Sequence, residues 1–298
     1  MAEPLVSVVL VSYNEETYIK QALDGILKQK TNFKFEIICH DDASTDSTQS
    51  IISIYKEKYH DIIVPILQNK NRMQAGHQII VEYCYPVAKG KYIAYCDGDD
   101  YWTDETKLQK QVDFLENNPE YSLCFHNFEY LYEDNKTVKP SDCGNFDRDF
   151  VVDEFIKWDS RFIPQLGTSL FRAELAMNRP EVFVKIGGGK KSKRPISDQP
   201  LYIYLAMKGK VRYFSEVMSI WRRHGNTWTN DGNIDKEIQF LNDKKVFLDT
   251  IGKNYPELNE ESILFAKRNC DYFIGWISED YSLAWANIRF VKVRTLTK

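Results

Sequence analysis

Short apolar runs alternate with amphipathic segments through the first hundred residues, and this alternation strongly restricts the fold of the chain. The runs Leu5–Val11, Phe35–His40 and Lys91–Cys96 are rich in β-branched and aromatic residues, as buried strands are. The segments Thr17–Lys30 and Ser47–Tyr59 carry apolar residues at helical spacing. This order predicts a mostly parallel, doubly wound α/β sheet, which binds ligands at the carboxyl ends of its strands.

Further elements are expected along the chain. Ile62–Leu67 is predicted to be an edge strand, because Pro65 cannot donate a ladder hydrogen bond. Helices are predicted over roughly residues 74–88 and over Glu105–Asn117. Val217–Trp221 is predicted to be a late strand.

The apolar spacing from about Asp235 onward predicts helices up to the C-terminus. We therefore divide the chain into an α/β domain over residues 1–230 and a helical C-terminal extension over residues 231–298. With 298 residues, of which 43% are hydrophobic, the chain can bury a sizeable core.

Composition restricts the functional class. A net charge of -4 argues against a nucleic-acid partner bound through bulk charge. The sequence has no long apolar run and no leader-like start, and its six cysteines show no zinc spacing. We expect a cytoplasmic protein with reduced thiols.

Three carboxylates directly follow the Lys91–Cys96 strand, at Asp97, Asp99 and Asp100. Carboxylates crowded at a strand end repel one another unless a positive charge neutralises them. Mn²⁺ or Mg²⁺ commonly does so, with substrate phosphates completing the coordination shell. A solvated acidic turn is the alternative interpretation, since Asp and Gly are good turn formers.

Polar clusters follow three of the predicted strands. They are Ser12–Glu15, Asp41–Asp46 and Asp97–Asp100. Each cluster alone is compatible with a turn and a helix cap, and Ser44 or Asp46 is a natural cap for the second helix. The carboxyl ends of parallel strands share one edge of the sheet, so the three clusters together predict one polar crevice.

These motifs, in this order, resemble the family 2 glycosyltransferases, which have the GT-A fold. The resemblance covers about residues 5–226, and the helical extension lies outside it. The matching segments are Val6–Glu15, Asp41–Asp46, Lys89–Trp102 and Ser197–Gln199. The resemblance implies an inverting enzyme of the bacterial polysaccharide-biosynthesis type.

The resemblance also assigns a nucleotide site. Tyr13, with Asn14 and Glu15, corresponds to the wall around the base, and Asp42 to the acceptor of the uracil imide hydrogen bond. The chain departs from the family near Arg72, where the usual Ala-Arg-Asn run is replaced. Arg72 remains a candidate contact to base or phosphate, and a uridine nucleotide is expected over a thymidine one.

The metal site implied by the resemblance contains Asp97, Asp99 and His224. Asp97 and Asp99 form the family's Asp-x-Asp, in which Asp99 is the expected direct ligand and Asp97 contacts ribose or metal. His224 resembles a histidine that some members use toward the metal or the diphosphate. A plain loop histidine is the alternative interpretation.

The remaining candidate residues contact the donor or the acceptor. Asp100 is expected near the donor sugar, and Arg222 and Arg223 near the diphosphate. Asp198 is the candidate general base, since an inverting transfer needs a carboxylate to accept the acceptor's hydroxyl proton. A helix N-cap is the competing explanation for Asp198.

The expected activity is metal-dependent transfer of a hexosyl or N-acetylhexosaminyl group from a nucleotide sugar to a glycan or lipid-linked glycan. One alternative is a non-catalytic nucleotide- or glycan-binding protein. Another is a sugar-1-phosphate nucleotidyltransferase, disfavoured because Ser12–Glu15 stands where a Gly-rich, Arg-containing loop is expected.

Two basic segments leave alternatives open. Gly187–Arg194 is either a mobile loop or a basic lid over a diphosphate. The tail Asn287–Lys298 is either a solvated terminal helix or a peripheral contact with the inner face of an anionic membrane.

Overall fold

The computed structural model groups the chain into two compact units. The described residues are 3–132, 138–141, 144–158, 164–184, 198–224 and 234–287. The first unit is Met1–Val151, Ser160–Arg179 and Leu205–Thr227, and the second is Val152–Asp159, Pro180–Tyr204 and Trp228–Lys298. The functional division near residue 230 stays a prediction.

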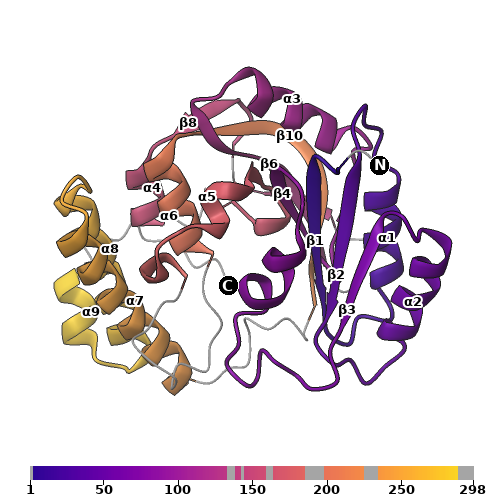
Figure 1. The fold of residues 1–298 in the computed structure, drawn as a ribbon. Helices are drawn as coiled ribbons and strands as arrows, with labels where there is room; N and C mark the ends of the chain where they lie inside the picture. The colour runs from indigo at the N-terminus through magenta and orange to yellow at the C-terminus, as the bar shows by residue number, and fades with distance from the viewer. Residues whose placement is uncertain are drawn as a thin grey trace. The chain divides into compact units, whose positions relative to one another are not determined.

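The first half of the first unit is a parallel sheet in the order β3-β2-β1-β4. Its two helices, α1 and α2, lie together on one face of these strands (Figure 1). Strand β3 is at the edge, as its proline predicts. The bounds are β1 Val6–Ser12, α1 Ile19–Leu27, β2 Phe35–Asp41, α2 Thr48–Lys58, β3 Ile63–Leu67 and β4 Tyr92–Asp97.

The second half of this sheet is mixed. Strand β9 is inserted antiparallel between β4 and β6, while β10 runs parallel to β6 and antiparallel to the short β5. Strand β10 is much longer than the predicted Val217–Trp221. The bounds are β5 Tyr101–Trp102, α3 Lys107–Asn117, β6 Tyr121–Tyr132, β7 Val138–Pro140, β8 Arg148–Phe150, η3 Leu166–Thr168, β9 Leu170–Arg172, α5 Ala173–Met177 and β10 Lys210–Arg223.

The predicted helix over residues 74–88 is wrong in its first part. The structure has a π-helix at Ile80–Cys84 followed by a 3₁₀ turn at Tyr85–Val87. Gly76 has a φ of 87°, a left-handed conformation that interrupts a right-handed helix. Pro86 lies in the first turn of the 3₁₀ segment and cannot donate a helical hydrogen bond.

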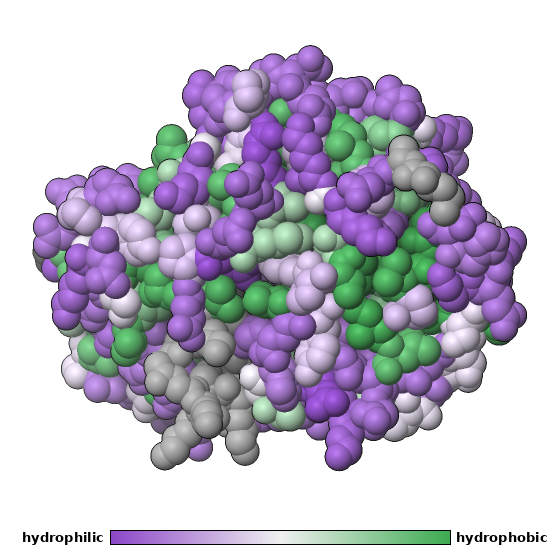
Figure 2. All heavy atoms as spheres, viewed as in Figure 1, coloured by the Kyte–Doolittle hydropathy of each residue, from purple (hydrophilic) through white to green (hydrophobic). Residues whose placement is uncertain are grey.

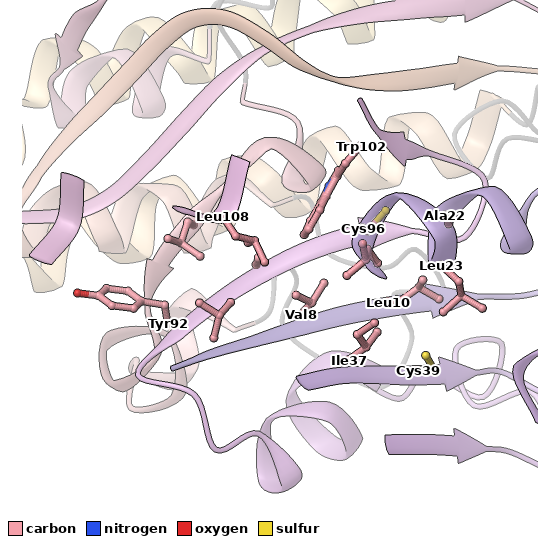
Figure 3. Packing of buried hydrophobic residues seen from close by; sticks show 14 of the residues in the cluster. Val8, Leu10, Ala22, Leu23, Ile37, Cys39, Tyr92, Cys96, Trp102 and Leu108 are labelled. Atoms are coloured by element: carbon pink, nitrogen blue, oxygen red, sulfur yellow. The ribbon is translucent and has the colours of Figure 1, made fainter. Parts of the chain in front are cut away.

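The core of the first unit forms where alternate residues of the parallel strands meet the helices. Figure 3 shows Val8, Leu10 and Ile37 on the sheet, with Leu23 of α1 and Leu108 of α3 among the residues packed with them. All five side chains are fully buried. Because burying one such side chain contributes about 1.5–3 kcal/mol, this cluster fixes the register of the strands that carry the polar loops.

The second unit is helical in its described C-terminal part, which confirms a helical appendage. The ring of Phe155 in α4 stacks on that of Tyr202 in α6, with centroids 5.9 Å apart. The ring of Phe183 in η4 packs on Phe247 of α7 at 6.1 Å. The bounds are α4 Val152–Lys157, η4 Glu181–Phe183, α6 Gln199–Lys208, α7 Ile234–Asn254, α8 Glu260–Ile277 and α9 Tyr281–Asn287.

The surface carries both polar and apolar residues. Figure 2 shows hydrophilic residues over much of the displayed face, with apolar residues exposed between them. Within the described ranges, no helix combines the length and the apolar character needed to cross a bilayer.

Candidate functional site

The loop after β1 is hydrogen-bonded to the loop after β2. The backbone N–H of Asn14 donates to Ser44 Oγ at 2.8 Å, and Asn14 Oδ1 accepts from the backbone N–H of Thr45 at 2.8 Å. The N–H of Glu15 donates to Thr48 Oγ1, also at 2.8 Å. Asn14 has a φ of 57°, a conformation that Asn adopts more readily than most residues. These bonds fix the two loops against each other.

The two consecutive aspartates after β2 have different surroundings. Asp41 is fully buried and accepts the backbone N–H of Ser44 at 2.9 Å, so it holds its own loop. Asp42 is 2% exposed, and its two oxygens accept the backbone N–H groups of Arg72 and Met73 at 2.7 and 2.9 Å. Each carboxylate oxygen has a second lone pair, so Asp42 can accept a further hydrogen bond while it keeps these two. The role of Asp42 toward uracil stays a prediction.

Tyr13 and Arg72 lie in the loops that follow β1 and β3. Tyr13 is 39% exposed, so its ring offers a surface on which a planar base can stack. The Arg72 guanidinium donates through Nε to Gln68 Oε1 at 3.2 Å. Their contacts with a nucleotide stay predictions.

The acidic loop after β4 lies close against the end of β1. The N–H of Gly98 donates to the carbonyl of Val11 at 2.8 Å. A Cβ on Gly98 would lie 2.9 Å from the Cβ of Ser12, closer than real Cβ contacts permit. The N–H of Asp100 donates to the carbonyl of Asp97 at 3.1 Å, which closes the turn. Glycine at this position lets the aspartates reach the β1 loop.

Glu15, Asp99 and His224 form a candidate metal site. One ligand atom from each lies within 4.8 Å of the others, and His224 Nε2 is 3.0 Å from Asp99 Oδ2. Asp97 is not a member of this cluster and remains a predicted ligand. Two carboxylates suit Mg²⁺ or Mn²⁺, and the imidazole favours the transition metal of the two. The residues therefore fit such a cation.

The electrostatics of Glu15 support this fit. Burial, followed by the charges of Asp99, Asp97 and Asp46, raises the pKa of Glu15 to about 8, against the lowering effect of Arg222. A divalent cation would relieve this repulsion. The sequence interpretation placed Glu15 only at the base. The available signal was its position directly after β1, at the sheet edge that the polar clusters were predicted to share; in the structure Val11 of β1 pairs with Asp97 of β4.

Asp100 is held inside the loop rather than presented at its surface. Its Oδ1 accepts the backbone N–H of Arg222 at 2.8 Å, and its Oδ2 accepts Gln165 Nε2 at 2.6 Å. Burial, followed by the charges of Asp99 and Asp97, raises its pKa well above the ordinary value. Sequence reasoning missed Gln165. The expected contact of Asp100 with the donor sugar stays a prediction.

The two arginines at the end of β10 have aromatic neighbours. Arg222 is buried, with 7% of the residue exposed. Its guanidinium lies 4.7 Å from the Tyr18 ring centre and 5.1 Å from that of Tyr101, and it donates to Gln21. The Arg223 guanidinium lies over the Trp221 ring at 4.8 Å. The predicted interaction of Arg222 and Arg223 with a diphosphate stays a prediction.

Asp198 belongs to the second unit and directly precedes α6, which confirms the predicted helix start. Its carbonyl accepts the N–H of Tyr202 at 3.2 Å. Burial raises the pKa of its carboxyl to about 6. Its role as general base stays a prediction. The basic segment 187–194 and residues 288–298 of the tail lie outside the described residues.

Two solved structures share the fold. Staphylococcus aureus TarS 1-349 in complex with UDP-GlcNAc superposes with a TM-score of 0.59 at 14% identity, covering 95% of this chain and 89% of TarS 1-349. The mannosyltransferase PcManGT of Pyrobaculum calidifontis, in complex with GDP-Man and Mn²⁺, has a TM-score of 0.55 at 17% identity, covering 99% of this chain and 77% of PcManGT. At these identities the likeness shows the GT-A fold alone.

The chain also has relatives in sequence, and a family model matches it. The uncharacterized protein Rv1520 of Mycobacterium tuberculosis is 36% identical over 220 residues, which are 74% of this chain and 59% of that protein. The Escherichia coli protein WfaP, a UDP-Glc:alpha-D-GlcNAc-diphosphoundecaprenol beta-1,3-glucosyltransferase, is 38% identical over 112 residues, 38% of this chain and 41% of WfaP. The chain thus spans less than two thirds of these relatives. The family model "Glycosyl transferase family 2" matches residues 7–178, and the chain belongs to this family.

Proposed function

We propose that this chain is a divalent-metal-dependent, inverting glycosyltransferase that moves a hexosyl or N-acetylhexosaminyl group from a UDP-sugar to a hydroxyl of a glycan or lipid-linked glycan. The observation that carries the proposal is the convergence of Glu15, Asp99 and His224 at the ends of β1, β4 and β10. A cation bound by these residues would explain why acidic groups crowd at one edge of the sheet.

Two comparisons support a uridine donor. TarS has been solved with UDP and with UDP-GlcNAc, and the printed name of WfaP specifies UDP-Glc. In this chain, the exposed ring of Tyr13 and the carboxylate of Asp42 would hold the base between the hydrogen-bonded loops after β1 and β2. PcManGT has been solved with GDP-Man, so the donor requires a direct test.

The proposed reaction is a single displacement. The acceptor oxygen attacks the anomeric carbon as the bond to the diphosphate oxygen breaks, and the Asp198 carboxylate takes the hydroxyl proton. A pKa of about 6 keeps Asp198 ionised at neutral pH and still basic. A cation held by Glu15, Asp99 and His224 would neutralise the charge that develops on the diphosphate. Arg222 and Arg223 add positive charge at the same edge.

The proposed acceptor is inferred from the relatives in sequence. WfaP acts on a sugar linked to diphosphoundecaprenol, according to its printed name, and such an acceptor lies at a membrane surface. We assign this chain to polysaccharide biosynthesis in the cytoplasm, at the inner face of the membrane. The basic tail up to Lys298 would supply peripheral contact.

A panel of nucleotide sugars, assayed for transfer and hydrolysis with Mn²⁺ and with EDTA, tests the proposal. We expect turnover of one UDP-sugar in Mn²⁺, abolished by EDTA and strongly reduced in Asp99→Asn. Metal-dependent binding without turnover would favour the non-catalytic alternative. Release of pyrophosphate from a sugar 1-phosphate and a nucleoside triphosphate would favour the nucleotidyltransferase.

A further inference from the structure

The ring of Tyr18 contacts two side chains from the end of β10. It stacks on the imidazole of His224, with centroids 5.3 Å apart and planes inclined by 26°. The Arg222 guanidinium lies 4.7 Å from the centre of the same ring. Tyr18 therefore joins the start of α1 to the strand that supplies the candidate metal histidine.

The backbone of Tyr18 is fixed to another member of the metal cluster. Tyr18 is the N-cap residue of α1, and its N–H donates to the carbonyl of Glu15 at 2.9 Å. The N–H of Ile19 donates to the same carbonyl at 2.8 Å. A single turn of chain thus carries both Glu15 and the ring that packs on His224.

His224 lies at the end of the described part of the sheet. It is the first residue beyond β10, which ends at Arg223, whereas the preceding part of the strand is anchored by the bond from Arg222 N–H to Asp100 Oδ1. An imidazole in this position can rotate about its side-chain bonds. The stack on Tyr18 restricts that rotation and keeps Nε2 on the side of Asp99, 3.0 Å from Oδ2.

We infer that Tyr18 is a positioning residue that holds the His224 imidazole in the orientation required for metal binding. The inference rests on the proposed metal-dependent function. Outer residues that orient a ligand histidine commonly contribute a factor of 10–100 to metal affinity or activity, on the order of the effect expected here. The contact is made by the ring face, so the phenolic hydroxyl is not required.

The test measures Mn²⁺ affinity by calorimetry or electron paramagnetic resonance, in the presence of UDP. Tyr18→Leu should weaken Mn²⁺ binding by about 10-fold, because it removes the stacking face. Tyr18→Phe keeps the ring and should retain native affinity. Tyr59→Leu is the matched control, since Tyr59 is the C-cap residue of a different helix, α2, and its ring packs on Tyr55. Circular dichroism checks that each variant is folded.

A second arm asks whether the effect passes through the histidine. In a His224→Ala background, Tyr18→Leu should cause no further loss of Mn²⁺ affinity. Native affinity in Tyr18→Leu, or an equal loss with and without His224, would overturn the inference. Absence of Mn²⁺ binding by the native protein would instead defeat the proposed metal-dependent function, a result distinct from either of these.

Discussion

Lys107 is an ionisable side chain buried in the core, and its substitution gives a sharp test of the packing against Trp102, which follows the acidic loop in the chain. Its side chain is fully buried, its Nζ lies 4.0 Å from the centre of the Trp102 ring, and it donates to Gln111 Oε1 at 2.8 Å. Burial lowers the pKa of Lys107 from 10.5 to about 7. Lys107→Met keeps an unbranched side chain and removes the charge.

The sign of the pH effect follows from the two pKa values. Between about pH 7 and pH 10.5 the unfolded chain holds a proton on Lys107 that the folded chain has released, so native stability rises with pH across this interval. At about 1.4 kcal/mol per pH unit, the interval corresponds to about 5 kcal/mol.

The assay is urea unfolding of native protein and Lys107→Met from pH 6 to pH 10. At pH 6 we expect the variant to be more stable by about 2–4 kcal/mol, since the relieved charge is offset partly by the unpaired Gln111 oxygen. Toward pH 10 the difference should vanish or reverse. Lys20→Met, at an exposed position in α1, is the control. A stability difference that stays constant across this pH range would refute the buried-charge reasoning.

Three further predictions concern the site. Asp198→Asn should retain nucleotide-sugar binding and lower turnover by about 10²–10⁴, and native turnover should fall as pH drops below about 6, because a base must be ionised; rate profiles and equilibrium binding check both statements. Glu15→Gln removes a candidate ligand charge and should weaken Mn²⁺ binding by about 10-fold or more in calorimetry, whereas unchanged affinity would remove Glu15 from the metal set. Gly98→Ala must displace the acidic loop from Ser12, so we expect a loss of about 1–3 kcal/mol in thermal unfolding together with weaker metal binding, and an unperturbed variant would contradict the close approach.

Local patterns predicted much of the first unit. The strands β1, β2 and β4 are short apolar runs, and each ends in a polar cluster, so both the sheet and its functional edge were accessible from sequence. The mixed pairing of β9 was not, because its three residues pair with strands far away along the chain. The first part of the helix predicted over residues 74–88 was wrong because that prediction gave too little weight to Gly76, whose φ is 87°.

The candidate site divides in the same way. Asp99 and His224 were predicted as metal ligands from motifs, and the structure brings them together. Glu15 as a ligand depends on the pairing of β1 with β4, and no spacing within its own motif expresses that pairing. The bond from Gln165 to Asp100 joins residues 65 positions apart and leaves no local trace in the sequence.

The hydrogen bonds between Asn14 and the Ser44–Thr45 segment also bear on the kinetics of donor capture. They hold the loops after β1 and β2 in place as hydrogen bonds within the protein. A nucleotide that enters between them need not order either loop, so little conformational entropy is lost on association. We expect the nucleotide to bind to this half of the site without a conformational change. The association rate should then be set by diffusion and electrostatic attraction rather than by loop closure. Residence time would then be the property that distinguishes one nucleotide sugar from another.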